Sequence, residues 1–166
     1  IVFEYEKGLL KTAATRGDGT FGEDVTLNVK TIESVPLRLR KDISVIVEGE
    51  VYMPISQFNR INKEQKKKGE ALYANPRNIT AGSIRQLDPR VVAQRKLATF
   101  IYDMVQSDTA LPPAQDKELA LLQNLGFRVN SHYRHCKKMS EVISFWKEWQ
   151  KKKDKEDYLI DGVVIK

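Results

Sequence analysis

The sequence predicts an α+β domain in which antiparallel strands pack against helices. Two stretches, residues 1–6 and 43–53, alternate apolar and polar side chains with the period of two that half-buried strands show. Residues 115–125 instead repeat leucine at helical spacing. Strands and helices do not alternate regularly, so the pattern does not indicate a parallel sheet. A chain of 166 residues suits one domain, or two small lobes that share a core.

A β-hairpin is expected at residues 1–15. Residues 1–6 alternate, and this places the apolar side chains of Ile1, Phe3 and Tyr5 on one face. Lys7-Gly8 supplies the turn, and residues 9–15 return as the second strand.

The clearest strand signal lies at residues 43–53. Glu48 and Glu50 occupy its even positions, so they should lie on the face opposite the apolar side chains. Further strands are expected at residues 97–105 and 159–166. The side chains of the strand at 43–53 that should face the core are those of Ile43, Val45, Val47, Val51 and Met53.

Two helices are expected in the first half of the chain. Asp24 is placed to cap a short helix at residues 25–31. Ser56 is placed to cap a helix that runs to Gly69. Residues 71–89 are expected to be irregular, because they contain an Asn-Pro pair and a glycine that break regular structure.

Two more helices are expected in the second half. The first covers residues 115–125 and ends at Gly126, which can adopt the left-handed conformation common after a helix. Ser140 is placed to cap the second. The apolar face of this second helix should consist of Val142, Ile143, Trp146 and Trp149.

Composition narrows the function classes without choosing one. Lys and Arg total 28 and Asp and Glu total 22, a net charge of +6 that suits either a polyanionic partner or a solvated lysine surface. The single cysteine, Cys136, excludes an intrachain disulfide and cannot build a zinc site. No run approaches the about 18 apolar residues of a membrane helix, so a cytoplasmic, membrane-free protein is expected.

Two polar segments lie where core formation would not place them. Residues 15–19 form a glycine-rich loop in which Arg16 offers a planar set of donors suited to phosphate or ribose oxygens. A turn with one exposed arginine is the simpler reading. Glu48 and Glu50 flank a glycine, and such carboxylates can accept hydrogen bonds from a ribose or help to hold a metal. A sheet face open to water would also explain them.

Two later segments carry the same ambiguity. Arg77 and Arg85 stand eight residues apart and suit phosphate contacts, although surface ion pairs would also account for them. Asp161 and Lys166 bound an apolar segment. Simple alternation would put these two side chains on opposite faces, so they share a cleft only if Gly162 bends the strand.

Taken together, these segments resemble the adenylation domain of bacterial NAD-dependent DNA ligases. The motifs occur in the family's order and spacing, and the likeness covers essentially the whole chain, most weakly at residues 106–157. The motifs are ATRGDGT at residues 14–20, GEDVT at 22–26, GEV at 49–51, ANPRN at 74–78, RQLDP at 85–89 and DGVVIK at 161–166.

The resemblance implies a nucleotidyltransferase fold and a covalent mechanism. In the family, a lysine attacks the adenylyl phosphorus of NAD, and the AMP then passes to the 5′-phosphate of nicked double-stranded DNA before the nick is sealed. By this resemblance Arg16, Glu50 and Lys166 bind the adenylate, Glu50 at the ribose. A divalent metal, Mg²⁺, is expected to assist, with its ligands left open.

The remaining motif residues have implied roles too. Arg77 and Arg85 match arginines required for ligation, with the nick phosphates or the adenylate as partners. Asp161 matches an acidic residue that would help the metal or orient a lysine, so it is a catalytic candidate with Glu50 and Lys166. Asp88 stands three residues from Arg85, and an ion pair between these two would be the structural alternative.

Several departures from the family pattern bear on activity. The Lys-x-Asp-Gly motif with the nucleophilic lysine is absent from the sequence, and further ligase domains are expected upstream and downstream. Lys153 stands where the family usually has arginine, and Leu159 where an acid is common. The chain is therefore expected to be part of a monomeric ligase and inactive alone. A non-catalytic adenylate- or DNA-binding module and an ATP-dependent relative are the alternatives.

Overall fold

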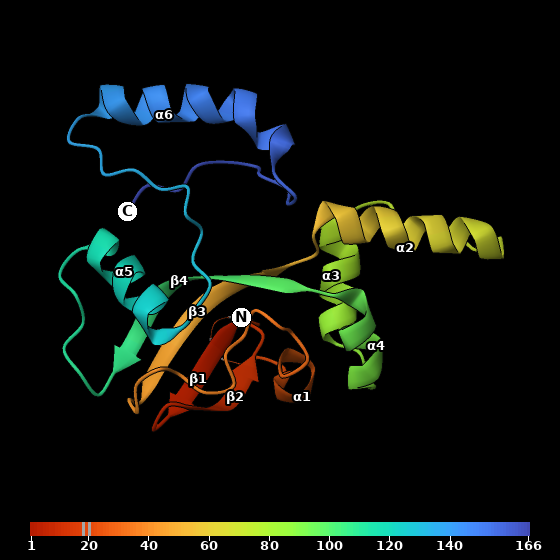
Figure 1. Cartoon of the computed structure of the whole chain (residues 1–166), viewed down its shortest axis with the longest axis horizontal. Coiled ribbons are helices and arrows are strands. Elements are labelled where there is room, and N and C mark those ends of the chain that lie inside the picture. Colours follow the sequence, from red (N-terminus) through yellow and green to blue (C-terminus); the bar gives the residue numbers. More distant parts are fainter. Residues whose placement is uncertain (18, 20) are drawn as a thin grey trace.

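The computed structural model describes residues 1–17, 19 and 21–166, and it confirms the α+β class. Four strands form one antiparallel sheet in the order β2-β1-β3-β4 (Figure 1). They are β1 (Val2–Glu6), β2 (Leu9–Ala14), β3 (Val45–Tyr52) and β4 (Ala98–Ser107). The expected hairpin is confirmed: Lys7 and Gly8 both have positive φ, 48° and 76°, which matches the twist of a two-residue hairpin turn.

One face of the sheet is buried in a single core. Val45, Val47 and Met53 of the third strand region lie in this core, as the alternation predicts. Helix α5 (Gln115–Leu125) has the bounds expected and buries Leu119, Leu122 and Leu125 in the same cluster. Gly126 ends it at φ 106°, the left-handed conformation expected for this position. Core packing thus leaves the opposite face of the sheet as the place for a site.

The expectation that residues 71–89 are irregular holds for residues 71–75 and 85–88 but is wrong for the rest. They contain α3 (Pro76–Ile84) and lead into α4 (Pro89–Arg95). The side chain of Asn75 accepts a hydrogen bond from the Asn78 N–H, and that of Asp88 accepts one from the Arg90 N–H. Each proline occupies the first turn, where its missing N–H is not needed. The Asn-Pro and Asp-Pro pairs therefore start helices here.

Three of the expected helix caps are wrong in detail. Helix α2 (Ile55–Lys68) ends at the left-handed Gly69 as expected, but Ser56 does not cap it. Helix α6 (Met139–Lys152) begins before Ser140, which does not cap it either. Helix α1 (Thr26–Val29) is shorter than expected, and its N-cap residue is Val25. The Asp24 carboxylate still accepts a hydrogen bond from the Thr26 N–H at 2.8 Å.

The start of α2 is capped from a distant part of the chain. The Asp157 carboxylate accepts hydrogen bonds from the N–H and the hydroxyl of Ser56, both at 2.7 Å, and its backbone carbonyl accepts one from the Ile55 N–H at 2.9 Å. An anionic acceptor at a helix N-terminus satisfies free donors and complements the helix dipole. Asp157 follows the 3₁₀ turn η1 (Lys153–Lys155).

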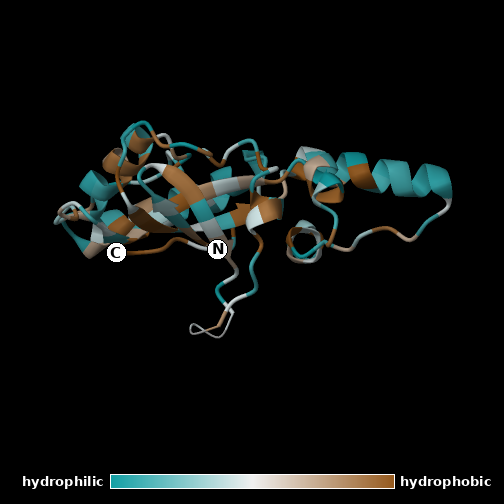
Figure 2. Cartoon of the chain, turned by 90° about the horizontal axis from the view of Figure 1, so that it is seen from below, coloured by the Kyte–Doolittle hydropathy of each residue, from teal (hydrophilic) through white to brown (hydrophobic). Residues whose placement is uncertain are grey.

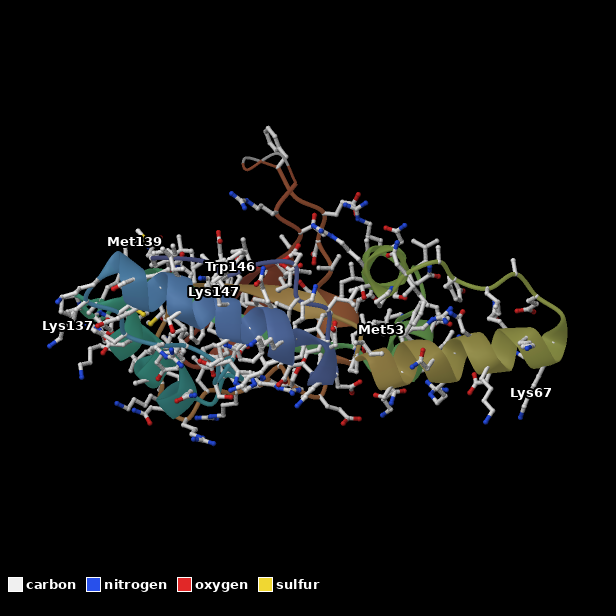
Figure 3. All side chains as sticks on the ribbon, turned by 90° about the horizontal axis from the view of Figure 1, so that it is seen from above. Met53, Lys67, Lys137, Met139, Trp146 and Lys147 are labelled. Carbon is white, nitrogen blue, oxygen red and sulfur yellow. The ribbon has the colours of Figure 1, made fainter. Side chains whose placement is uncertain are left out.

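Helix α6 presents a different face from the one expected. Trp149 is buried and Val142 is half-buried, as expected, whereas Ile143 and Trp146 are 46% and 45% exposed. Phe145 takes the inward place between them, where its ring contacts Trp149. Seen from above, α6 and α2 follow one another along the long axis, and the loop between β2 and α1 projects to one side (Figure 3).

The expected strand at 159–166 is absent from the structure. The segment returns from α6 toward β4 without joining a strand ladder, and Leu159 and Val164 are 62% and 84% exposed (Figure 1). Alternating apolar residues form a strand only where a neighbouring strand supplies hydrogen bonds.

No helix in the described parts of the chain has the length and apolar character to cross a bilayer. The outer half of α2 is largely hydrophilic (Figure 2).

Candidate nucleotide site on the open face of the sheet

The two glutamates of β3 lie on the face of the sheet opposite the core, as expected. Glu50 is exposed and Glu48 is half-buried. Gly49 between them is required by packing: an added Cβ would lie 2.5 Å from Cδ1 of Ile101 and 2.7 Å from the carbonyl oxygen of Phe100. The glycine therefore allows β4 to approach closely, and the carboxylates on either side are left facing outward.

A β-bulge places Tyr102 beside these glutamates. Glu48 pairs with Asp103 and Gly49 with Ile101, so Tyr102 is the extra residue on β4. Burial raises the pKa of the Tyr102 hydroxyl, and the charges of Glu48 and Glu50 raise it further. The strand register places both glutamates near Tyr102, since Glu48 lies opposite Asp103 and Glu50 opposite Phe100. Sequence reasoning did not select Tyr102, although a tyrosine next to an acid in an expected strand was an available signal.

Arg16 and Lys166 approach the same tyrosine. The positive charge of Arg16 acts on the Tyr102 hydroxyl in the direction opposite to the glutamates, lowering its pKa. The Lys166 Nζ lies 5.6 Å from the centroid of the Tyr102 ring, within the range of a cation–π contact. Of the three residues expected to bind adenylate, Lys166 thus contacts the Tyr102 ring, and the charges of Arg16 and Glu50 act on its hydroxyl.

The loop that carries Arg16 is closed at its base by two hydrogen bonds. The Thr15 N–H donates to the Glu23 carbonyl, and the Glu23 N–H donates to the Thr15 hydroxyl, both at 2.9 Å. A Cβ on Gly22 would lie 1.9 Å from the Thr15 carbonyl oxygen, so this glycine is needed for the tight neck of the loop. Within the same motif, Asp18 and Thr20 lie outside the described residues.

Arg85 is tied to this loop. Its Nε lies 3.0 Å from Glu23 Oε2. The alternative suggested by the sequence, an ion pair between Arg85 and Asp88, is therefore wrong. Asp88 pairs with Arg90 instead, at 2.8 Å. Arg85 follows the last turn of α3, where the buried Asn28 side chain donates to the carbonyls of Ile84 and Gln86 on either side of it. Arg85 therefore belongs to the same side of the molecule as the glycine-rich loop.

Arg77 and Asp161 form a separate, more open pair. The Arg77 Nη1 lies 4.0 Å from Asp161 Oδ2, and the two side chains are 80% and 97% exposed. Such a pair adds little to stability, so both groups remain available to a ligand. Asp161 lies toward α3, whereas Lys166 contacts β4. The structure therefore does not bring Asp161 and Lys166 together. The shared cleft that a bend at Gly162 would have allowed is not formed.

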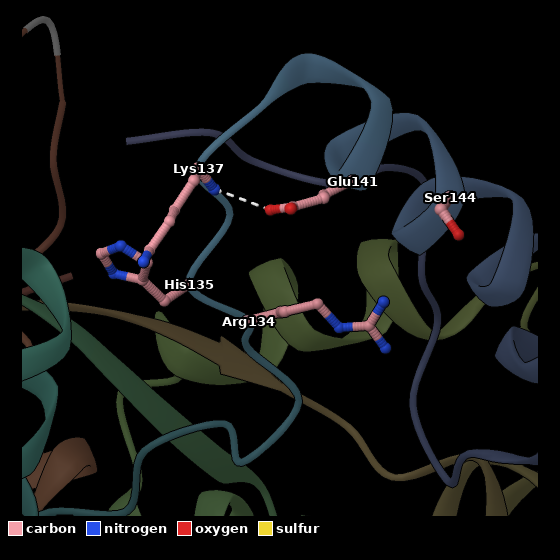
Figure 4. A pocket seen from close by; sticks show the side chains of 5 residues that line it. All are labelled: Arg134, His135, Lys137, Glu141 and Ser144. Carbon is pink, nitrogen blue, oxygen red and sulfur yellow. Dashed lines mark hydrogen bonds between the residues drawn. The ribbon is translucent and has the colours of Figure 1, made fainter.

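One hollow on the described surface lies elsewhere. It has a volume of about 490 Å³ and is lined by Arg134, His135, Lys137, Glu141 and Ser144, between the loop before α6 and the helix itself (Figure 4). The Lys137 backbone N–H donates to Glu141 Oε2 at 2.7 Å. None of the motif residues lines this hollow. We therefore place the candidate site on the open sheet face, where the geometry gathers charges around an aromatic ring.

The mixed fold, with its antiparallel sheet and packed helices, is that of a ligase adenylation domain. A family model described as the NAD-dependent DNA ligase adenylation domain matches residues 1–166. The chain belongs to this family.

The relatives found by comparison bear the name DNA ligase. Those of Thermotoga maritima, Petrotoga mobilis and Bacillus thuringiensis are 49%, 45% and 45% identical to the chain over 166 residues. Each match covers 100% of the chain but only 24% or 25% of the relative. The chain thus spans about a quarter of the length of these ligases.

Proposed function

We propose that this chain holds the adenylate half of NAD on the open face of its sheet, as part of an NAD-dependent DNA ligase used in DNA replication and repair. The observation that carries the proposal is that the Lys166 ammonium lies 5.6 Å from the centre of the Tyr102 ring, while the charges of Arg16 and Glu50 act on the same tyrosine. Two cations, an acceptor for hydroxyl groups and an aromatic ring are the complement of a nucleoside monophosphate.

Each side chain suits one part of the nucleotide. The Tyr102 ring offers a stacking surface for adenine, because it is 38% exposed on the open face. The Glu50 carboxylate can accept hydrogen bonds from the ribose hydroxyl groups. Arg16 and Lys166 supply positive charge for the phosphate, Arg16 with two parallel donors and Lys166 as a point charge.

The proposed reaction is adenylyl transfer. A lysine nitrogen forms a bond to the adenylyl phosphorus of NAD, and the bond to nicotinamide mononucleotide breaks. The AMP then moves to the 5′-phosphate of a nick in DNA, and the 3′-hydroxyl displaces it. The sequence has no Lys-x-Asp-Gly motif to supply that lysine, so the 166 residues by themselves should bind but not react.

Arg77 and Arg85 are assigned to the phosphates at the nick. Both are exposed, and both lie on or just after α3. Eight residues of helix separate them by about 12 Å, a spacing that can reach neighbouring phosphates. The net charge of +6 favours an approach to DNA. We expect the ligase to act as a monomer in the cytoplasm.

The residues present fit a magnesium ion held mainly by the substrate. Among the described residues no group of three His, Cys, Asp or Glu side chains is placed to hold a metal. Mg²⁺ commonly takes one or two carboxylates and completes its shell with phosphates and water. Glu48 and Glu50 are carboxylates on the open face that could contribute to its shell, and the ion would neutralise charge on the transferring phosphorus.

The test is the choice of nucleotide. A complete ligase that carries this sequence should gain one adenylyl group in intact mass spectrometry when incubated with NAD and magnesium, and none with ATP. A gain with ATP alone would favour an ATP-dependent relative. Binding of NAD without any gain would favour a non-catalytic adenylate-binding module.

A further inference from the structure

The open face of the sheet ends in a cluster of three charged groups from three parts of the chain. The Lys166 Nζ lies 2.7 Å from Asp103 Oδ1, and these side chains are 38% and 35% exposed. The neighbouring Asp103 raises the pKa of the Glu118 carboxyl. Oε1 of Glu118 accepts a hydrogen bond from the Met104 N–H at 2.7 Å. Asp103 and Glu118 have no part in the function proposed above.

Both carboxyl groups are held by regular structure. The bulge at Tyr102 sets the direction of Asp103, which pairs with Glu48 across the strands. Glu118 lies in the first turn of α5, next to the buried Leu119, and its hydrogen bond from the Met104 N–H fixes α5 to β4. The position of the Lys166 ammonium is therefore defined by groups that cannot move far.

The charges in the cluster are interdependent. Burial raises the pKa of Glu118, the Met104 N–H lowers it, the neighbouring Asp103 raises it, and the Lys166 ammonium lowers it. Neighbouring carboxyl groups repel each other when both are ionised. Lys166 is the cation that contacts Asp103, and its charge also acts on Glu118, so the two carboxyl groups favour keeping the ammonium in place.

We propose that Asp103, supported by Glu118, is a positioning residue that holds the Lys166 ammonium at the edge of the Tyr102 ring for contact with the nucleotide. The inference rests on the proposed adenylate site. A lysine on a flexible four-carbon stem loses rotamer freedom when it binds a phosphate. Asp103 removes part of that freedom beforehand and occupies only one of the three N–H donors, so the others can serve the ligand.

A double-mutant cycle in a complete ligase carrying this sequence tests the inference. The four proteins are the parent, Asp103→Asn, Lys166→Ala and the double variant. NAD affinity is measured in chelator, and the single-turnover rate of AMP–enzyme formation in magnesium. Asp103→Asn is isosteric and should lower the rate about tenfold, the lower range for a hydrogen bond to a charged group. It should have no further effect on either quantity when Lys166 is alanine.

Two results would overturn the inference: an unchanged rate and affinity in Asp103→Asn, or an equal loss with and without Lys166. Glu118→Gln should give a smaller loss that also disappears in the Lys166→Ala background. Glu33→Gln is the matched control, since it removes an exposed ion pair with Lys96 outside the cluster and should change neither quantity. If the parent forms no AMP–enzyme, the proposed function fails, and the affinity cycle still decides the role of Asp103.

Discussion

Replacing Asn28 with alanine should destabilise the chain, because one buried amide holds the end of α3 in place. Asn28 is 7% exposed, and its Nδ2 donates to the carbonyls of Ile84 and Gln86 at 2.8 and 2.7 Å. These two carbonyls flank Arg85. The single side chain thus joins α1 to the segment that directs Arg85 toward the glycine-rich loop.

The size of the effect follows from the two carbonyls left without a donor. Each buried, unsatisfied polar group costs about 1–3 kcal/mol. The bond to Gln86 is only partly buried, so water can replace it in part. We therefore expect a loss of about 2–4 kcal/mol, a large share of the roughly 5–15 kcal/mol that stabilises a typical domain. Asn28→Asp should be at least as damaging, because its carboxylate faces two carbonyl oxygens.

Urea unfolding of the chain, followed by far-ultraviolet circular dichroism, measures the change. The control is Asn59→Ala on the exposed side of α2, expected to stay within about 0.5 kcal/mol of the parent. An Asn28→Ala variant that unfolds within the same margin would refute the reasoning, because the two short hydrogen bonds would then contribute nothing net.

Three further outcomes are expected. The 166-residue chain incubated with NAD and magnesium should show no adenylyl gain in intact mass, because the sequence has no Lys-x-Asp-Gly motif; a stoichiometric adduct would contradict this. In a complete ligase, Glu50→Ala should impair self-adenylation and leave cooperative unfolding intact, since Glu50 lies away from the core; unchanged adenylation would count against the ribose role. Arg16→Ala should mainly weaken the step with NAD. Arg77→Ala and Arg85→Ala should instead slow sealing by pre-adenylated enzyme, measured in single turnover. The expected slowing is roughly 30- to 1000-fold, for a loss of about 2–4 kcal/mol of transition-state stabilisation. Sealing at the parent rate would return both arginines to the nucleotide pocket or to structure.

Strand alternation was the most informative part of the sequence. In β3, the odd positions lie in the core and Glu48 and Glu50 face outward, because a period of two leaves no other arrangement once one face is buried. Helix α5 could be placed to the residue, since its three leucines and Gly126 agree on one answer. Both predictions depend on local spacing alone.

The proline-containing segment was misread for a physical reason. A proline breaks a helix that is already running but starts one well at the first turn. Asn75 and Asp88, directly before the prolines, are strong N-cap residues, so the pair of signals favoured helix starts. By contrast, the replacement of Ser56 by Asp157 as the cap of α2 could not be predicted, because the two residues are 101 positions apart.

The site was predictable in its members but not in its grouping. The motifs supplied Arg16, Glu50 and Lys166, whereas their meeting point depends on a bulge in β4 that leaves no clear mark in the sequence. That bulge turns Tyr102 and Asp103 to the open face. The prediction of a strand at residues 159–166 was wrong because alternation indicates a preference for strand conformation but does not show whether a neighbouring strand is present.

The bond between Asp157 and the start of α2 has a consequence for the order in which the chain is completed during synthesis. The ribosome adds residues from the N-terminus, so α2 is made long before its capping carboxylate. Until residue 157 emerges, the first turn of α2 must leave its free N–H groups to water, and bringing the two partners together closes a loop of 101 positions. The same closure brings in the segment that ends at Lys166. We therefore expect Lys166 to reach β4 only once Asp157 has capped α2.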